Sequence, residues 1–328
     1  MTPTGLIDPF GRRVTYLRVS VTDRCDLRCT YCMSEIMKFL PKRDVLALDE
    51  LSAITHHFID RGIRKVRISG GEPLVRRDIM ELMRDLSGRL GQDLKELTLT
   101  TNATQLSRFA DDLAAMGVRR INVSLDTLDR ELFAKLCRRD RLPDVLDGLQ
   151  AAREAGLAVK VNTVLLPDNI GEIADMTAWL HAQGFDHSLI EIMPMGETGA
   201  DRRAQFVPAA AAREALEARF SLTPMIASDP HAGPARFWRV EETGGRVGFI
   251  SPLTNNFCAS CNRVRLTCTG RVYQCLGRDE HVDLRAVLRE GGDIDAAILK
   301  ALGRKPERHD FAIAARASVS RHMSVTGG

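Results

Sequence analysis

Short runs of β-branched and aliphatic residues alternate with longer amphipathic stretches from residue 16 to about residue 195. Each apolar run is bounded by glycine or polar residues, which is typical of buried strands. The runs predict six strands, at Tyr16–Val21, Lys65–Ser69, Glu96–Thr101, Arg120–Ser124, Ala158–Val164 and Ser188–Ile192. The stretches between them predict helices at Asp49–Arg61, Asp78–Leu86, Gln105–Met116, Asp144–Ala155 and Ile170–Gln183. This alternation predicts an α/β fold with βα units around a parallel sheet.

The pattern leaves the shape of this sheet open. Right-handed crossovers between parallel neighbours give either a doubly wound open sheet or a curved partial barrel, and periodicity does not choose between them. After residue 195 the pattern changes to one helical stretch, at Ala209–Phe220, and two strand-like runs, at Arg236–Glu241 and Val247–Ile250. We therefore predict a domain boundary near residue 200, with residues 1–200 forming the βα domain and residues 201–328 a second region.

The composition indicates a globular protein with a sizeable core. Hydrophobic residues make up 44% of the 328 residues and charged residues 27%. The formal net charge is only +3, so we expect no nucleic-acid partner, and any anion site must be local. No apolar run is long enough to span a membrane, and the opening segment MTPTGLIDPFGRRV lacks the apolar centre of a secretory signal. We expect a cytoplasmic protein that does not bind membranes.

The first of two cysteine groups follows the first predicted strand directly. Cys25, Cys29 and Cys32 form a CxxxCxxC pattern, and grouped thiols in a cytosolic chain are typical ligands of zinc or iron. Zinc would need a fourth ligand, and the nearest histidines are His56 and His57. Three thiolates on a 4Fe-4S cluster leave one iron free to bind a small molecule. The pattern favours the cluster, with a zinc knuckle as the alternative.

Four further strand ends carry residues suited to binding a ligand. The segment Gly70–Pro73, with sequence GGEP, ends the second strand, and glycines there let the backbone approach a ligand closely. A simple strand-to-helix turn is the alternative interpretation. Thr100–Asn102 and Ser124–Asp126 add hydroxyls and a carboxylate at the same face. Met193 could pack against an adenine ring, although a methionine there is more often part of a core.

The second cysteine group lies near the carboxyl end of the chain. Cys258 and Cys261 form a CxxC pair, and Cys275 follows after 13 further residues. A zinc ribbon with Cys268 as its fourth ligand is the alternative to a second cluster.

Two arginines follow this CxxC pair. In an extended segment Arg263 and Arg265 point to one face, where two guanidiniums beside a metal centre form a clamp suited to phosphate. Arg18 on the first strand and Arg67 on the second offer further cations near the same end of the sheet. Buried arginines need anionic partners, so an anionic ligand is expected.

The cysteine pattern and the glycine pair resemble the radical S-adenosylmethionine superfamily. Within it, nearly the whole chain resembles the GTP 3',8-cyclases, the first enzymes of molybdenum cofactor biosynthesis. The matching segments are SVTDRCDLRCTYCM, VRISGGEPLVRRD, TTN, RRINVSLD, VKVNTV, NRVRL between the later cysteines, and the terminal Gly327 and Gly328. The resemblance implies a six-unit partial TIM barrel, closed by a C-terminal extension that carries a second Fe-S cluster.

The resemblance also implies a role for each matching residue. It makes Cys25, Cys29 and Cys32 ligands of one 4Fe-4S cluster and Cys258, Cys261 and Cys275 ligands of a second. It implies S-adenosylmethionine contacts from Tyr31, Gly71, Ser124 and Met193. It implies GTP contacts from Arg18, Arg67, Thr100, Lys160, Arg263 and Arg265. Arg263, Arg265, Gly327 and Gly328 are expected to be catalytic, with the terminal glycines inserted into the active site.

The implied reaction converts GTP to (8S)-3',8-cyclo-7,8-dihydroguanosine 5'-triphosphate through a 5'-deoxyadenosyl radical. The implied partners are GTP, a reductant such as flavodoxin or ferredoxin, the downstream cyclic pyranopterin monophosphate synthase, and a second copy of the chain in a homodimer. A peptide-modifying radical enzyme with an auxiliary cluster is one alternative, but it has no need of the paired arginines or the terminal glycines. A non-catalytic zinc-binding module is the other alternative.

The sequence departs from the family pattern at two positions. Ser69 replaces the threonine that often precedes GGEP, and Ala103 replaces the glycine of TTNG. Alanine avoids positive φ angles, so Ala103 puts the turn after the third strand in doubt. Cys137 and Cys268 lie outside the pattern, and we expect both to be ordinary small apolar residues.

Overall fold

The computed structural model describes residues 5–226, 233–313 and 319–327. Twelve strands within these residues form one sheet in the order β12-β11-β10-β1-β2-β3-β4-β5-β6-β9-β8-β7. Neighbouring strands from β10 through β1–β6 to β9 run parallel, and each edge ends in antiparallel strands. The strands are β1 (Tyr16–Ser20), β2 (Lys65–Ser69), β3 (Glu96–Thr101), β4 (Arg120–Ser124), β5 (Ala158–Leu165), β6 (Asp186–Glu191), β7 (Leu222–Pro224), β8 (Arg236–Val240), β9 (Arg246–Ile250), β10 (Arg263–Leu266), β11 (Arg271–Tyr273) and β12 (His281–Asp283).

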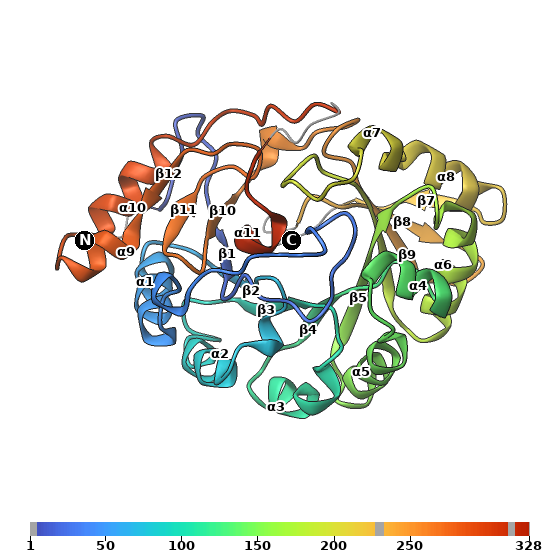
Figure 1. Cartoon of the computed structure of the whole chain (residues 1–328), viewed down its shortest axis with the longest axis horizontal. Coiled ribbons are helices and arrows are strands. Elements are labelled where there is room, and N and C mark those ends of the chain that lie inside the picture. Colours follow the sequence, from blue (N-terminus) through green and yellow to red (C-terminus); the bar gives the residue numbers. More distant parts are fainter. Residues whose placement is uncertain (1–4, 227–232, 314–318, 328) are drawn as a thin grey trace.

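Helices connect most of the parallel strands. The α-helices are α1 (Leu48–Asp60), α2 (Ile79–Ser87), α3 (Ala110–Ala115), α4 (Arg130–Cys137), α5 (Leu142–Glu154), α6 (Ile173–Ala182), α7 (Arg202–Gln205), α8 (Ala209–Glu217), α9 (Leu284–Arg289), α10 (Ile294–Leu302) and α11 (Met323–Thr326). Short 3-10 turns add η1 (Lys42–Asp44), η2 (Pro73–Val75), η3 (Leu106–Arg108), η4 (Ile170–Glu172) and η5 (Cys258–Ser260). In Figure 1 the sheet curves around a central space, with α1, α2, α3 and α5 outside it and α11 within it.

The two faces of the parallel strands differ in polarity. Side chains alternate between the faces of a strand, and one set, including Leu17, Val66 and Leu97, packs with helix residues such as Phe58 in the main core. Burial of each such aliphatic side chain is worth about 1.5–3 kcal/mol. The opposite, inner face carries polar residues on most of the central strands, among them Arg18, Thr100 and Lys160. The apolar core that stabilises the fold therefore lies on the outer side of the sheet, and the polar inner face is available to bind a ligand.

All six predicted strands are confirmed to within two residues at either end. The predicted helix at Gln105–Met116 is interrupted and forms η3 and α3. Helix α4 is missing from the prediction. Its N-cap residue is Asp129, whose side chain accepts a hydrogen bond from Leu132 N (2.7 Å), and its C-cap residue is Arg138, which has a φ of +54°. The glycine that stops other helices of this chain is absent there, so the end of α4 carried no sequence signal.

The region after residue 200 continues the same sheet. The two strand-like runs predicted there are confirmed as β8 and β9, and β9 pairs with β6. Strand β10, which was expected only to be extended, pairs with β1. The parallel sheet is therefore extended on both sides by strands from the carboxyl-terminal region.

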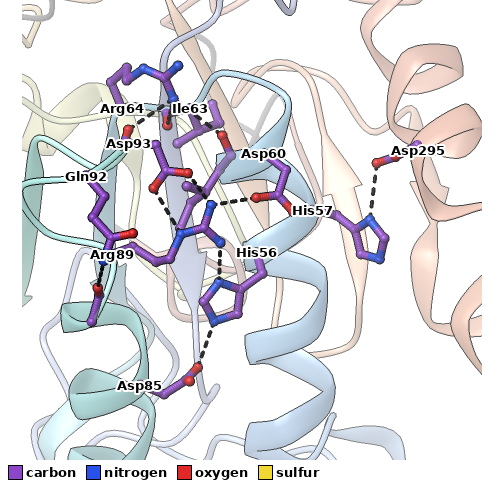
Figure 2. Close-up of polar contacts among 12 residues, drawn as sticks. His56, His57, Asp60, Ile63, Arg64, Asp85, Arg89, Gln92, Asp93 and Asp295 are labelled. Carbon is purple, nitrogen blue, oxygen red and sulfur yellow. Dashed lines mark hydrogen bonds and ion pairs between the residues drawn. The ribbon is translucent and has the colours of Figure 1, made fainter. Parts of the chain in front are cut away.

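A network of ion pairs ties the outer helices together (Figure 2). Arg89 contacts Asp60 (2.5 Å), His56 Nδ1 (3.0 Å) and Asp93, and His56 Nε2 also contacts Asp85 at 3.0 Å. These contacts join α1 to α2 and to the loop that follows it. Separately, His57 Nδ1 lies 3.2 Å from Asp295 Oδ1, which joins α1 to α10.

None of the helices in the described residues combines the length and the hydrophobicity that a membrane span requires.

Candidate active site

The loop that follows β1 and carries the first cysteine group packs against the glycine pair that follows β2. Gly71 N donates to Thr22 O and Glu72 N donates to Arg24 O, both at 2.8 Å. A Cβ on Gly71 would lie 2.3 Å from Arg24 O. Gly70 has a φ of +153°, and a Cβ there would lie 2.6 Å from Thr22 O. Only glycine allows this approach, so the structure shows that the glycine pair positions the cysteine loop.

The Glu72 side chain fastens the end of β2 to the end of β3. It is fully buried and accepts hydrogen bonds from Leu74 N (2.9 Å), Thr101 Oγ1 (2.8 Å) and Asn102 N (2.6 Å). Burial raises the pKa of Glu72 to about 7, although the hydrogen bonds favour the ionised form. Sequence reasoning treated this residue only as part of GGEP and missed its role in joining the strands.

Asn102 connects the end of β3 to the first cysteine. Its Nδ2 donates to Asp26 Oδ1 at 2.7 Å and lies 3.7 Å from Cys25 Sγ. Thr104 Oγ1 donates to the other carboxylate oxygen of Asp26 at 2.5 Å. The polar residues predicted at this strand end therefore hold the loop around Cys25.

Tyr31 is held by Asp126, which follows β4, and by Arg202, the first residue of α7. Its hydroxyl donates to Asp126 Oδ2 at 2.7 Å, and Asp126 Oδ1 accepts from Val164 N at 2.9 Å. Burial raises the pKa of Asp126 to about 6. The buried Arg202, which sequence reasoning missed, donates to Tyr31 O (2.9 Å) and Met195 O (2.6 Å). These bonds fix the second half of the cysteine loop.

Cys137 lies next to the first cysteine group. Its Sγ is 3.7 Å from Cys29 Sγ. Two backbone bonds bracket this contact, from Arg28 N to Cys137 O and from Thr30 N to Leu136 O, both 2.9 Å. Cys137 is buried, as expected of a small apolar residue, but the expectation that it is merely ordinary overlooked its contact with Cys29.

The three thiols of the first group lie in environments that oppose their ionisation. Burial raises the pKa of Cys25 well above its usual value and that of Cys32 to about 12, and the contact with Cys137 together with burial does so for Cys29. Binding iron would therefore release protons. Among the described residues, no three His, Cys, Asp or Glu side chains converge to hold a single metal ion. His56 and His57 are instead engaged by Asp85 and Asp295 (Figure 2).

The second cysteine group surrounds the start of β10. Burial raises the pKa of Cys275, and the nearby Cys261 and Cys258 raise it further. The three thiols therefore lie close enough to affect one another's ionisation. Lys305 Nζ lies 3.5 Å from Cys261 Sγ and also donates to Arg263 O at 3.1 Å. Burial opposes ionisation of Cys261, but Arg263 and Lys305 outweigh it and lower its pKa to about 6. A thiolate at neutral pH fits a metal ligand. Lys305 was not identified from the sequence.

Cys268 lies outside this second group. It is fully buried, its carbonyl accepts a bond from Leu46 N at 2.7 Å, and burial raises its pKa to about 12. The charged groups that affect it are Asp23 and Arg76 rather than the other cysteines. This environment matches the expectation that Cys268 is a core residue.

Three of the predicted GTP-binding arginines form one row across the inner face. Arg265 on β10, Arg18 on β1 and Arg67 on β2 are partners in register. Burial, aided by the neighbouring arginines, lowers the pKa of Arg18 to about 10 and that of Arg265 well below its usual value. In the described part of the chain, none of the three forms an ion pair with a carboxylate. Such a row is suited to a polyanion.

Lys160 extends this positive region along β5. Burial and the nearby Arg67, Arg120 and Lys65 hold its pKa well below the usual value. Lys65 is paired with Glu96 at 3.0 Å, whereas no carboxylate among the described residues pairs with Lys160. Arg263, the remaining predicted cation, stacks over the ring of Phe257 with 5.1 Å between Cζ and the ring centroid.

Other inner-face polar atoms also lack partners within the described structure. They are Thr100 Oγ1, Asn162 Oδ1, Ser188 Oγ, and Nε of both Arg18 and Arg67. Buried polar groups are normally bonded, so this set indicates a polar ligand inside the sheet. Of these residues, Asn162 and Ser188 were missed. Their alternation with buried apolar residues along β5 and β6 is the signal that could have revealed them.

The carboxyl-terminal tail enters the inside of the sheet. Helix α11 lies in the centre of Figure 1, and Arg265 donates to Gly327 O at 2.7 Å. Gly327 has a φ of +74°, and a Cβ on it would lie 2.0 Å from Ser69 Oγ. The structure thus brings Gly327 to the predicted site residues, whereas Gly328 lies outside the described residues.

The remaining predicted S-adenosylmethionine contacts lie at strand ends. Ser124 is the last residue of β4 and is in register with Asn162. Met193 follows β6, is half-buried, and accepts a backbone bond from Met195 N at 2.8 Å. Both lie at the same ends of the parallel strands as Gly71 and Tyr31.

Two family models match the chain. The Radical SAM superfamily model matches residues 19–180, and the Molybdenum Cofactor Synthesis C model matches residues 185–311. Together they include both cysteine groups.

Similar solved structures show the same fold. Streptococcus suis SuiB bound to S-adenosylmethionine aligns with a TM-score of 0.64 at 16% identity, over 95% of this chain and 77% of that one. Native anSMEcpe with bound AdoMet aligns with a TM-score of 0.62 at 17% identity, over 90% of this chain and 82% of that one. At these identities the likeness concerns the fold alone.

Much closer relatives share the full length of the chain. The GTP 3',8-cyclase of Mesorhizobium japonicum is 56% identical over 99% of this chain and 100% of its own length. Those of Paracoccus denitrificans and Erythrobacter litoralis are each 55% identical, over 98% and 100% of this chain and 96% and 100% of their own lengths. The chain therefore belongs to the GTP 3',8-cyclase family of radical S-adenosylmethionine enzymes.

Proposed function

We propose that this protein converts GTP to (8S)-3',8-cyclo-7,8-dihydroguanosine 5'-triphosphate in the first step of molybdenum cofactor biosynthesis. Family membership at 54–56% identity supports the reaction. The row of unpaired cations on the inner face is the observation that supports the triphosphate substrate most directly. A nucleoside triphosphate carries several negative charges, and one arginine guanidinium can bind two phosphate oxygens at once.

Cys25, Cys29 and Cys32 would hold a 4Fe-4S cluster with one iron open to S-adenosylmethionine. When bound, this cluster supplies the electron that cleaves S-adenosylmethionine to methionine and a 5'-deoxyadenosyl radical. The protein's own contribution is to orient the reactants. Tyr31, Gly71, Ser124 and Met193 lie at the strand ends where they would position S-adenosylmethionine.

Arg18, Arg67 and Lys160 would bind the phosphates and ribose of GTP from the inner face, with Thr100 alongside. The chemistry requires the ribose C3' to face the radical, and a displacement of about 1 Å can cost on the order of a hundredfold in rate. Arg265 and Gly327, which are joined by a hydrogen bond, would close the site against water. We assign the catalytic roles to Arg263, Arg265, Gly327 and Gly328.

The carboxyl-terminal region would complete this active site. Cys258, Cys261 and Cys275 would hold a second 4Fe-4S cluster, and the low pKa of Cys261 favours ligation. Residues 1–200 would form a six-unit partial TIM barrel, which residues 201–328 close. A protein electron donor such as flavodoxin or ferredoxin, a downstream cyclic pyranopterin monophosphate synthase and a homodimeric state complete the proposal.

The test is anaerobic reconstitution followed by product analysis. With S-adenosylmethionine, GTP and dithionite, the protein is expected to yield 5'-deoxyadenosine and the cyclised nucleotide. Two clusters predict about eight irons per chain, falling to about four when Cys258, Cys261 and Cys275 are replaced by alanine. Cys268→Ala is the control and should keep about eight. Absence of both products from a fully loaded protein would refute the proposed function.

A further inference from the structure

Basic side chains that have no carboxylate partner among the described residues gather on and beside the loop that carries the first cysteine group. We propose that this surface docks an acidic one-electron carrier protein and so supplies the first cluster with electrons. This inference rests on the proposed function, because only a reductive site at Cys25, Cys29 and Cys32 needs such a donor. The surface, which we call the basic collar, comprises Arg24, Arg28, Lys38, Arg138 and Arg139.

Side-chain contacts join Arg24, Arg28 and Arg138 of the basic collar into one surface. The Phe39 ring lies 5.9 Å from Arg24 Cζ and 4.9 Å from Arg28 Cζ. Arg138, at the end of α4, donates to Met33 O at 3.2 Å and to Arg28 O at 3.4 Å. Lys38 and Arg139 adjoin these residues in sequence and are exposed.

The basic collar groups several cations that have no ion pair. Exposed arginines elsewhere include some with acidic partners, as Arg130 has in Asp140 and Arg289 in Glu50, and the formal net charge of the whole chain is only +3. Within the described residues, no collar side chain lies within ion-pair distance of a carboxylate. Glu35 is the one exposed acidic residue in the loop that joins the cysteines to Lys38. Uncompensated charge of this kind steers an acidic partner.

The basic collar also contains an apolar contact point. Ile36 is 89% exposed, and the neighbouring Phe39 is half-buried under the two arginines. Protein interfaces combine such an apolar centre with a charged rim.

The basic collar also adjoins the cysteines that are proposed to hold the first cluster. Arg24 directly precedes Cys25, and Arg28 donates to the backbone carbonyl of Cys25. Arg138 directly follows Cys137, whose Sγ is 3.7 Å from Cys29 Sγ. A carrier bound here would pass one electron to the site held by the three cysteines; the carrier is oxidised by one electron, and no bond forms or breaks.

The experiment compares two triple variants of equal charge in the reconstituted holoenzyme. The collar variant is Arg24→Glu, Lys38→Glu and Arg139→Glu. The matched control is Lys95→Glu, Lys300→Glu and Arg304→Glu, three exposed cations without carboxylate partners among the described residues. Reduction by flavodoxin, the acidic carrier used as the probe, is followed by absorbance in a stopped-flow instrument at low and high salt.

We expect the collar variant to be reduced by flavodoxin at least tenfold more slowly than the control, with a weaker dependence on salt. Binding of oxidised flavodoxin to the cluster-free chain should fall in parallel. Turnover driven by dithionite should stay unchanged in both variants, since the small reductant needs no docking surface.

Equal rates for the collar variant and the control would overturn the proposal, as would wild-type protein that dithionite reduces but flavodoxin does not. Failure of the proposed function is distinguishable, because it would appear as loaded wild-type protein that makes no product even with dithionite.

Discussion

At the scale of single residues, the backbone geometry of the site depends on positions where the presence or absence of a Cβ atom matters. Ala103 is the clearest departure from the family pattern, and it adopts a φ of +65° all the same. Its N–H donates to Thr101 Oγ1 at 3.0 Å, which keeps the turn after β3. The sequence raised doubt about this turn, and the structure retains it at the cost of backbone strain, which for a non-glycine residue is about 1–2 kcal/mol.

This strain predicts an unusual response to glycine. Ala103→Gly and Ala152→Gly each remove a fully buried methyl group, but Ala152 lies within helix α5. Glycine relieves the strain at residue 103 and weakens the helix at residue 152. Urea unfolding should therefore show Ala103→Gly to be less destabilising than Ala152→Gly by about 2 kcal/mol. Equal losses would show that Ala103 is unstrained.

Glu72 predicts a pH dependence of stability. Burial raises its pKa to about 7 in the folded protein, compared with about 4.3 in an unfolded chain. The folded state then holds this proton more tightly, so the stabilisation is complete below about pH 4.3 and is lost as the pH rises through 7. From pH 5 to pH 8.5, the free energy of unfolding of the cluster-free wild type should fall by about 2 kcal/mol relative to Glu72→Gln. A constant difference between the two proteins would contradict this assignment.

At the scale of elements, the positions of the central strands were predictable from the sequence. The contacts between these strands and the carboxyl-terminal tail were not. Each central strand has an apolar outer face that packs on helices and a polar inner face, so its position followed from local pattern. Helix α4 was not predicted because it ends without glycine. Strands β11 and β12 were not predicted because each is only three residues long. Bonds such as Arg265 to Gly327 join residues 62 positions apart, so no local pattern could predict them.

The tail predicts a sharp intolerance at Gly327. An alanine there would put Cβ 2.0 Å from Ser69 Oγ and would keep a φ of +74°. We expect Gly327→Ala to displace α11, so that hydrogen exchange of Val325 to Gly327 rises at least tenfold and turnover falls by a similar factor. Gly171→Ala is the control, because a Cβ at Gly171 meets no atom within 4 Å. A protected tail in Gly327→Ala would contradict the close packing described here.

At the scale of the whole molecule, the fold separates stability from function. The outer face of the sheet holds the core, and the inner face carries cations that lie close enough to repel one another. The cysteine groups and the cation types were readable from the sequence. Their assembly was not, because the row of Arg265, Arg18 and Arg67 depends on the pairing of β10 with β1.

This separation predicts opposite effects for two lysines. Lys160→Met removes a cation without a carboxylate partner in the described chain, so the GTP-free protein should gain about 1 kcal/mol of stability while GTP affinity falls at least tenfold. Lys65→Met breaks the pair with Glu96 and should instead destabilise the protein by about 1 kcal/mol or more. Urea unfolding and equilibrium GTP binding measure both effects. A Lys160→Met protein that is less stable and binds GTP normally would contradict the phosphate role.

The proposed function requires the cysteine loop and the cationic inner face to act on one bound GTP. The most direct measurement uses GTP deuterated at the ribose C3' with the anaerobically reconstituted enzyme, S-adenosylmethionine and reductant. Mass spectrometry of the 5'-deoxyadenosine should then show transfer of the deuterium, together with formation of the cyclised nucleotide. Deoxyadenosine that carries no deuterium, alongside GTP left unchanged, would show that the site does not bring the two reactants together.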